Sequence, residues 1–170
     1  MEPFYGWRSW IARRDRLRSL YVPVLWPTDG PLRAECLAGQ TEGLRPAGWT
    51  RATARDAGCA PCPGLDCTCG IYAGAALGEV RRVSYARSHL HLALGIVRGW
   101  GRLIEHEHGW RAQYAAPVAL LLPAAGLRPA RLRPRSRRRA QELEALAASY
   151  AIPLITERQA AEWLNVTPTD

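Results

Sequence analysis

The longest regular pattern of hydrophobic and polar positions runs from Leu90 to Leu122. Large apolar residues alternate there with small or polar ones, as expected for strands that bury one face. The polar run EHEHG at 105–109 interrupts the pattern, and apolar residues resume directly afterwards. We therefore predict a β-hairpin with its tip at 105–109, and we expect the strand pair around Trp100 and Trp110 to form the centre of the fold.

Shorter patterns surround this hairpin. Aromatic and β-branched residues punctuated by prolines predict strands near Gly6–Ile11 and Leu20–Leu25, with a turn at Trp26–Pro31. Apolar residues at helical spacing predict a helix within Ala73–Ser88.

The C-terminal region is helical in its pattern. Apolar residues at spacings of three and four predict a helix over Arg137–Tyr150, with Ser136 as its N-cap. A short extended segment at Ala151–Ile155 leads to a last predicted helix, Glu157–Leu164. Together the elements predict an α+β fold, in which a small curved antiparallel sheet or partly open barrel is followed by C-terminal helices. We expect residues 1–125 to form a mostly β domain and residues 126–170 to supply a basic connection and helices that pack on it.

The cysteines lie in or next to a segment that has too few apolar residues to form a core of its own. Gly39–Asp66 has a loop composition, and four of the five cysteines follow the spacing Cys59-x2-Cys62-x4-Cys67-x-Cys69, with Cys36 upstream. Thiolates are preferred zinc ligands, and a bound ion orders a loop that apolar burial cannot. A structural zinc site that stabilises this loop is our main hypothesis. Free thiols, a disulfide and a redox role remain alternatives, and the spacing leaves open which four cysteines bind.

Histidines and acidic residues form a second candidate group. His89 and His91, and likewise His106 and His108, would share a strand face and could converge on a metal or act as acid and base. A polar strand edge and a hairpin tip explain the same residues, and no HExxH spacing accompanies them. A narrower hypothesis is a polar ligand site formed by Glu105, His106 and Arg111.

The overall composition is that of one ordinary globular domain. The chain has 170 residues, 48% hydrophobic and 22% charged, so a packed core can form. No apolar run approaches the roughly 18 residues needed to cross a bilayer, and the N-terminus lacks the regions of a secretory signal. We therefore expect a cytoplasmic protein. The seven tryptophans, against a single Phe, are either core residues or stacking platforms for bases.

The formal net charge of +8 indicates an anionic partner. All 23 basic residues are arginine, which is typical of a GC-rich genome, but such bias explains neither their excess over 15 acidic residues nor their clustering. The cluster predicts an exposed surface that binds nucleic acid through its phosphates. Its members are Arg128, Arg131, Arg133, Arg135, Arg137, Arg138 and Arg139.

Five ordered blocks stand out between residues 5 and 120: GWRSW (6–10), LWP (25–27), AEC (34–36), DCTCGIYA (66–73) and GWGRLIEHEHGWRA (99–112). Together they resemble a group of small proteins of actinobacteria and their mobile elements that have no established activity. In that group a His commonly precedes the Cys-x-Cys pair, and Cys59 stands in its place here. The resemblance implies Cys36, Cys59, Cys67 and Cys69 as zinc ligands and Cys62 as an extra thiol, but it implies no reaction.

Three function classes follow from these observations. The first is a non-enzymatic, zinc-stabilised module that binds nucleic acid or a nucleoprotein complex through its arginines. The second is a protein-interaction adaptor of a mobile element or defence system, whose basic surface is only genomic bias. A small enzyme using Glu105, His106 and Arg111 ranks last, because the sequence has no recognisable catalytic triad or phosphate-binding glycine loop.

Overall fold

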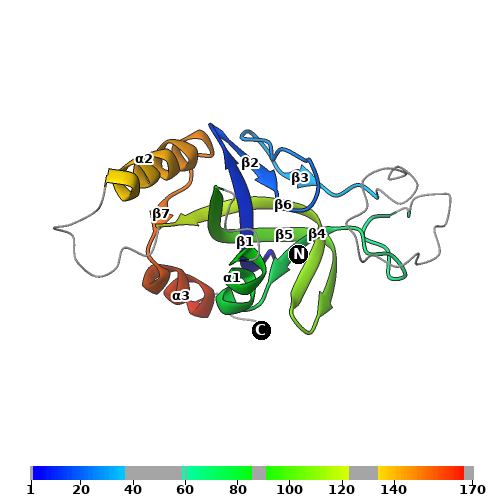
Figure 1. The fold of residues 1–170 in the computed structure, drawn as a ribbon. Helices are drawn as coiled ribbons and strands as arrows, with labels where there is room; N and C mark the ends of the chain where they lie inside the picture. Colours follow the sequence, from blue (N-terminus) through cyan, green and yellow to red (C-terminus); the bar gives the residue numbers. More distant parts are fainter. Residues whose placement is uncertain (1, 37–58, 60, 86–90, 123–133, 167–170) are drawn as a thin grey trace.

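The fold is built around one long hairpin, formed by β5 (Leu92–His106) and β6 (Gly109–Leu121) (Figure 1). The computed structural model describes residues 2–36, 59, 61–85, 91–122 and 134–166. Antiparallel pairs run from Gly95 opposite Leu120 to His106 opposite Gly109, with two shifts of register along the way. The predicted hairpin and its tip are therefore confirmed.

Four strands pair in a partial ring. β1 (Phe4–Arg13) lies antiparallel to β5, and β4 (Ile71–Gly74) lies antiparallel to β6. β1 and β4, the two ends of this ring, meet in a single residue pair, Trp7 with Gly74. We call these four strands the barrel. The sheet is extended by the short strands β2 (Arg16–Ser19), β3 (Leu32–Arg33) and β7 (Leu154–Ile155). The expected α+β class, with a small, mostly antiparallel sheet, is confirmed.

Trp110 packs inside the ring. Its side chain is 4% exposed, and its indole N–H donates a 3.0 Å hydrogen bond to the backbone carbonyl of Tyr5, on the far side of the ring. A Cβ at Gly99 would lie 2.3 Å from the indole, and one at Gly6 would lie 2.9 Å from its nitrogen. These glycines therefore provide the space that the large side chain needs.

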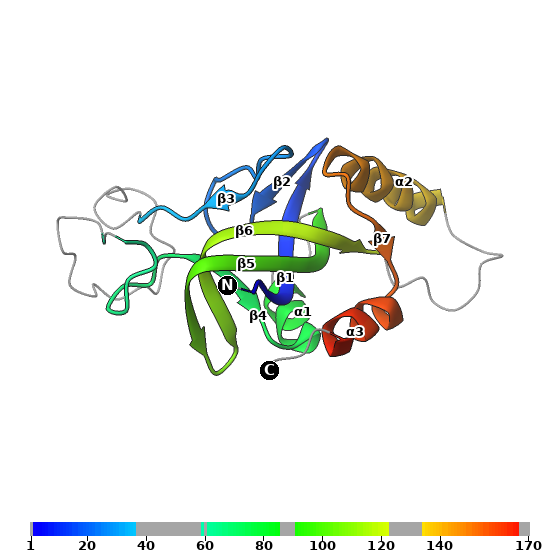
Figure 2. The same ribbon diagram turned by 180° about the vertical axis from the view of Figure 1, so that it is seen from behind.

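Helix α2 (Pro134–Ser149) completes the core at one end of the barrel, opposite the cysteine-bearing loop (Figures 1 and 2). Leu143, Leu146 and the following Tyr150 join the same apolar cluster as Trp10 and Trp26. The Tyr150 hydroxyl accepts a hydrogen bond from the backbone N–H of Leu17 at 2.8 Å and donates one to the Trp26 carbonyl at 2.9 Å. The C-terminal region is thereby anchored to the β barrel.

The other two helices cover a second apolar cluster. α1 (Leu77–Tyr85) and α3 (Glu157–Val166) pack against side chains on the outer face of β1, β5 and β6. Thr156 caps α3, since its hydroxyl oxygen accepts a 3.3 Å hydrogen bond from the backbone N–H of Gln159. None of the helices in the described ranges combines the length and the apolar composition needed to cross a membrane.

Several predicted boundaries are wrong. The second strand is β2, which ends at Ser19, and within Leu20–Leu25 only Leu25 forms an isolated bridge, to Arg18. Ser136 is not an N-cap, because α2 already begins at Pro134, a residue whose fixed φ suits the first helical turn. The prediction at Leu20–Leu25 misplaced the strand, whereas the prediction at Arg137–Tyr150 found the helix and misplaced its start.

Two larger corrections concern the core. The helix predicted from Ala73 begins only at Leu77, because residues 71–74 form β4, the strand that closes the ring. Trp100 is half-buried and stacks on Tyr114, with ring centroids 6.1 Å apart, whereas Trp110 is the buried residue. Gly99 and Gly101, on either side of Trp100, leave space for side chains of β6. A Cβ at Gly99 would lie 2.3 Å from the Trp110 ring, and one at Gly101 would lie 2.8 Å from the Gln113 side chain.

Candidate metal centre

Two segments that are distant in sequence bring the cysteines together. Cys36 follows β3 by three residues, and Cys69 precedes β4 by two. β3 and β4 both pair with β6, at Tyr114–Ala115 and Gly109–Ala112 respectively. Because neighbouring stretches of one strand hold both segments, their ends converge beside it.

Four thiols form a compact cluster there. The Sγ atoms of Cys36, Cys59, Cys67 and Cys69 all lie within 4.8 Å of one another. The Cys59 and Cys69 sulfurs are 2.9 Å apart, and those of Cys36 and Cys67 are 3.6 Å apart. Four thiolates around a tetrahedral zinc, each at about 2.3 Å, would have sulfur separations of about 3.8 Å. The cluster could therefore hold a metal ion such as zinc with small adjustments of side-chain torsions.

Cys62 is not a member of this group. Its side chain is 9% exposed and packs in the main apolar cluster, beside the fully buried Pro63. The grouping in the structure is the one implied by the resemblance, with Cys62 as the additional thiol.

The environment disfavours negative charge on these sulfurs unless a cation is present. Burial raises the pKa of Cys69 to about 12 and also raises the pKa values of Cys67 and Cys62. The pKa of Cys59 is raised chiefly by its hydrogen bond with Cys69. A bound divalent cation would favour the charged form instead, because a thiol that coordinates it loses its proton. The donor set thus has the chemistry of a soft metal site.

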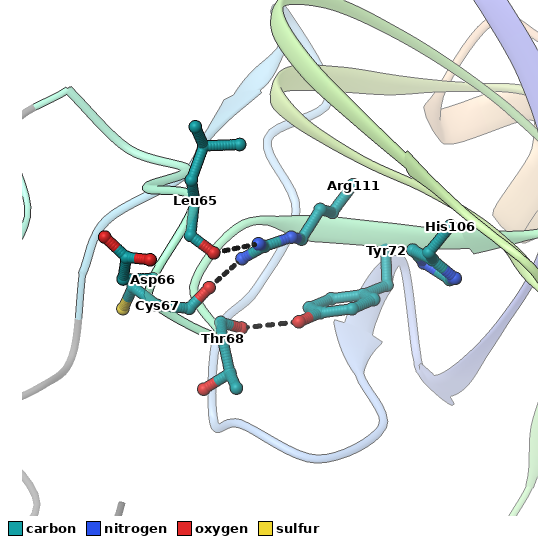
Figure 3. A pocket seen from close by; sticks show the side chains of 7 residues that line it. All are labelled: Leu65, Asp66, Cys67, Thr68, Tyr72, His106 and Arg111. Atoms are coloured by element: carbon teal, nitrogen blue, oxygen red, sulfur yellow. Dashed lines mark hydrogen bonds between the residues drawn. The ribbon is translucent and has the colours of Figure 1, made fainter. Parts of the chain in front are cut away.

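Arg111 of β6 fastens the cysteine loop to the barrel (Figure 3). Arg111 is 8% exposed, and its guanidinium donates hydrogen bonds to the carbonyl oxygens of Cys67, Cys69 and Leu65. The Tyr72 hydroxyl donates a further 2.7 Å hydrogen bond to the Thr68 carbonyl. Sequence reasoning did not foresee this use of Arg111, because backbone carbonyls leave no signature in a sequence.

The predicted polar ligand site of Glu105, His106 and Arg111 is divided by the hairpin register. Ile104 lies opposite Arg111 and Glu105 opposite Trp110, so Glu105 and Arg111 project from opposite faces. His106 and Arg111 do line one pocket of about 360 Å³, together with Tyr72 and the loop 65–68 (Figure 3). Arg111 is nevertheless occupied by the loop carbonyls, and Glu105 does not line this pocket.

Among the residues that the structure describes, the histidines form no common site. His89 lies outside the described residues, His91 is exposed just before β5, and His106 is the last residue of that long strand. His108 is exposed at the hairpin tip, where its Nδ1 lies 3.2 Å from Glu79. These positions fit a polar strand edge and a polar tip.

The predicted arginine surface is described only in part. Arg128, Arg131 and Arg133 lie outside the described residues, and Arg135 and Arg137 are placed only as backbone positions of α2. Arg138 is exposed and its Nε lies 3.1 Å from Glu142. Arg139 is partly buried, donates to the Leu92 carbonyl and also pairs with Glu142.

The tryptophans divide between core and surface. Trp7, Trp10, Trp26 and Trp110 are buried, as expected for core residues. Trp49 lies outside the described residues, and Trp163 is 44% exposed on α3.

Comparison with known proteins adds no family to this picture: no protein-family model, no curated protein and no solved structure matches the chain significantly.

Proposed function

We propose that Cys36, Cys59, Cys67 and Cys69 bind one structural zinc ion, and that the chain is a non-enzymatic, zinc-stabilised module that binds nucleic acid. The observation that carries the metal proposal is the approach of four sulfurs to within 4.8 Å, from two segments of the chain, one at Cys36 and the other between Cys59 and Cys69. Such convergence gives a metal a fold-stabilising role, since the ion would link two segments that are distant in sequence.

A structural role fits the donor set better than a catalytic one. Four cysteines fill all the positions of a tetrahedral zinc, whereas catalytic zinc sites keep one position for water or substrate. Zinc with four thiolates carries a net charge of about −2. Arg111 forms no ion pair with a carboxylate among the described residues, and it lies against the carbonyls of Cys67 and Cys69. Its positive charge would offset part of that negative charge.

The nucleic-acid part of the proposal rests on charge. The chain carries a formal net charge of +8, and the arginine cluster continues into α2 at the end of the barrel away from the cysteines. Arg138 there is exposed. Guanidinium groups suit phosphate because they offer paired donors in a fixed plane. In this arrangement the zinc site orders the fold and a separate surface meets the partner.

One preparation tests both parts. Elemental analysis of the purified protein should give one zinc per chain, and fluorescence anisotropy with labelled duplex DNA should give an affinity that falls steeply with salt. The logarithmic slope is about −0.9 for each phosphate contact on duplex DNA. Changing Arg135, Arg137 and Arg138 to Gln should flatten that slope and leave the melting temperature nearly unchanged. Arg139 is retained because it also holds β5.

Each part has its own contradicting outcome. Intact thiols without stoichiometric metal would end the zinc proposal. Absence of binding to DNA and RNA, or binding without salt dependence, would end the nucleic-acid proposal and favour the adaptor function.

A further inference from the structure

The turn between β1 and β2 carries three exposed arginines. Arg14 and Asp15 form the tip, and the strand register places Arg13 directly opposite Arg16. None of the three arginines pairs with a carboxylate among the residues that the structure describes. With one acidic residue, Asp15, among three arginines, the turn carries an excess of positive charge.

This arrangement is unfavourable for the isolated hairpin. Like charges directly opposite each other destabilise an antiparallel pair. Arg14 also has φ 49°, in the left-handed region where Gly, Asn or Asp is the usual residue. Backbone strain of this kind, kept at a surface, is typical of binding sites. An anion bound at the turn would remove the repulsion between Arg13 and Arg16.

The turn also borders a hollow. A pocket of about 390 Å³ is lined by Arg13, Arg14 and Arg16, by Asp15, and by the apolar side chains of Ala12 and Leu25. Leu25 is 52% exposed. Guanidiniums beside a small apolar floor suit a sugar-phosphate unit, whose charged phosphate and less polar sugar would meet matching groups.

The fold brings this turn to the same end of the barrel as α2. Ile11 pairs with Leu92, and the Ala12 N–H donates a 2.7 Å hydrogen bond to the His91 carbonyl. Arg139 of α2 donates to the Leu92 carbonyl. In both views the tip of β1 and β2 lies beside the C-terminal end of α2, whereas the arginines of α2 are in its first turns (Figures 1 and 2). Glu142 pairs with Arg138 and Arg139 of α2, and Asp15 lines the pocket beside the turn arginines.

We propose that the β1–β2 turn is a second phosphate-binding contact of the nucleic-acid surface, at the same end of the barrel as α2. The inference rests on the proposed nucleic-acid function and assigns a site to it. A backbone with one phosphate per nucleotide matches arginines spread from the turn to the helix, and it requires no base-specific groups.

The test compares two triple variants of equal charge. Arg13→Gln/Arg14→Gln/Arg16→Gln alters the turn, and Arg82→Gln/Arg98→Gln/Arg158→Gln alters three exposed arginines on α1, β5 and α3. Anisotropy with labelled duplex DNA is measured between about 50 and 200 mM salt. The turn variant should flatten the salt slope by about 0.9 for each phosphate that its arginines neutralise in the wild-type protein, and the control should change the slope much less. Both should retain the wild-type zinc content.

A single substitution provides a check that does not depend on the triple variant folding. Arg14→Gly suits the left-handed backbone, so the protein should melt at the same temperature or higher while its salt slope falls by about 0.9. Equal changes of slope in the two triple variants would overturn the turn site and leave the nucleic-acid function intact. Failure of the wild-type protein to bind DNA or RNA would end both. Tight binding of a poly-glutamate peptide that displaces DNA from the turn would overturn the assignment to nucleic acid.

Discussion

Arg111 donates a 2.9 Å hydrogen bond to the backbone carbonyl of Cys69. The bond joins the central hairpin of the fold to a member of the four-thiol cluster. Because Arg111 is buried and also holds the carbonyl of Cys67, it fixes the direction of the chain through both cysteines. The geometry of the cluster is therefore set partly by a residue that offers no ligand.

Replacing Arg111 should weaken metal binding without removing a ligand. Arg111→Met leaves the carbonyls of Leu65, Cys67 and Cys69 without their donor, and removal of supporting hydrogen bonds of this kind typically costs about 10- to 100-fold in metal affinity. Competition with a chromogenic chelator measures the change. Arg98→Met, on the exposed face of β5, is the matched control. An Arg111→Met protein with unchanged zinc affinity would show that the hydrogen bonds do not support the site.

The cysteines should separate into ligands and a core residue. Cys67→Ser removes one of four ligands, so zinc should be lost on purification and the melting temperature should fall. Cys62→Ala should retain one zinc per chain, with only a modest loss of stability from the buried position. Elemental analysis and thermal denaturation distinguish the two. Full zinc content in Cys67→Ser would refute the ligand set.

Trp110 should contribute much more to stability than Trp100. Trp110→Ala removes a buried side chain from the ring, which typically costs about 3 to 5 kcal/mol. Trp100 is only half-buried, against Tyr114 and Arg98, and Trp100→Ala should cost clearly less. Urea denaturation of the two variants measures both values. Equal losses of stability would mean that the interior of the barrel is organised differently.

Tyr150 should make the protein less stable at alkaline pH. Burial raises the pKa of Tyr150 above its usual value near 10. As the pH rises, Tyr150 therefore loses its proton first in the unfolded state. The contribution of its hydroxyl to the free energy of unfolding is fully present below about pH 10. It decreases above that pH, by about 1.4 kcal/mol per pH unit between the pKa of the unfolded state and that of the folded state.

The variant Tyr150→Phe isolates this effect. It should be less stable at neutral pH, because the buried N–H of Leu17 and the carbonyl of Trp26 lose their partner, at about 1 to 3 kcal/mol for each unsatisfied group. Its stability should also decrease less steeply between about pH 9 and 11. Parallel curves for the two proteins in chemical denaturation would contradict the role assigned to the hydroxyl.

The sequence by itself determined the elements whose pattern is local. Alternation along 90–122 specified the central hairpin, and the charged run at 105–109 specified its tip, because a strand's buried face repeats at every second residue. The spacing of Leu143, Leu146 and Tyr150 specified the second helix in the same way. The cysteine-rich segment was recognisable because it combines soft ligands with too few apolar residues to order itself.

Only the tertiary structure decided which of these parts meet. Four residues at 71–74 are too few for a clear pattern, yet as β4 they close the ring, since Gly74 pairs with Trp7 across 67 positions of the chain. Arg111 contacts carbonyls more than 40 positions away, and Tyr150, directly after α2, accepts a hydrogen bond from Leu17 of β2. The apolar pattern of a helix or strand indicates which of its faces is buried, but it does not indicate which other element covers that face. Partners so distant in sequence are chosen by packing and backbone hydrogen bonding in three dimensions.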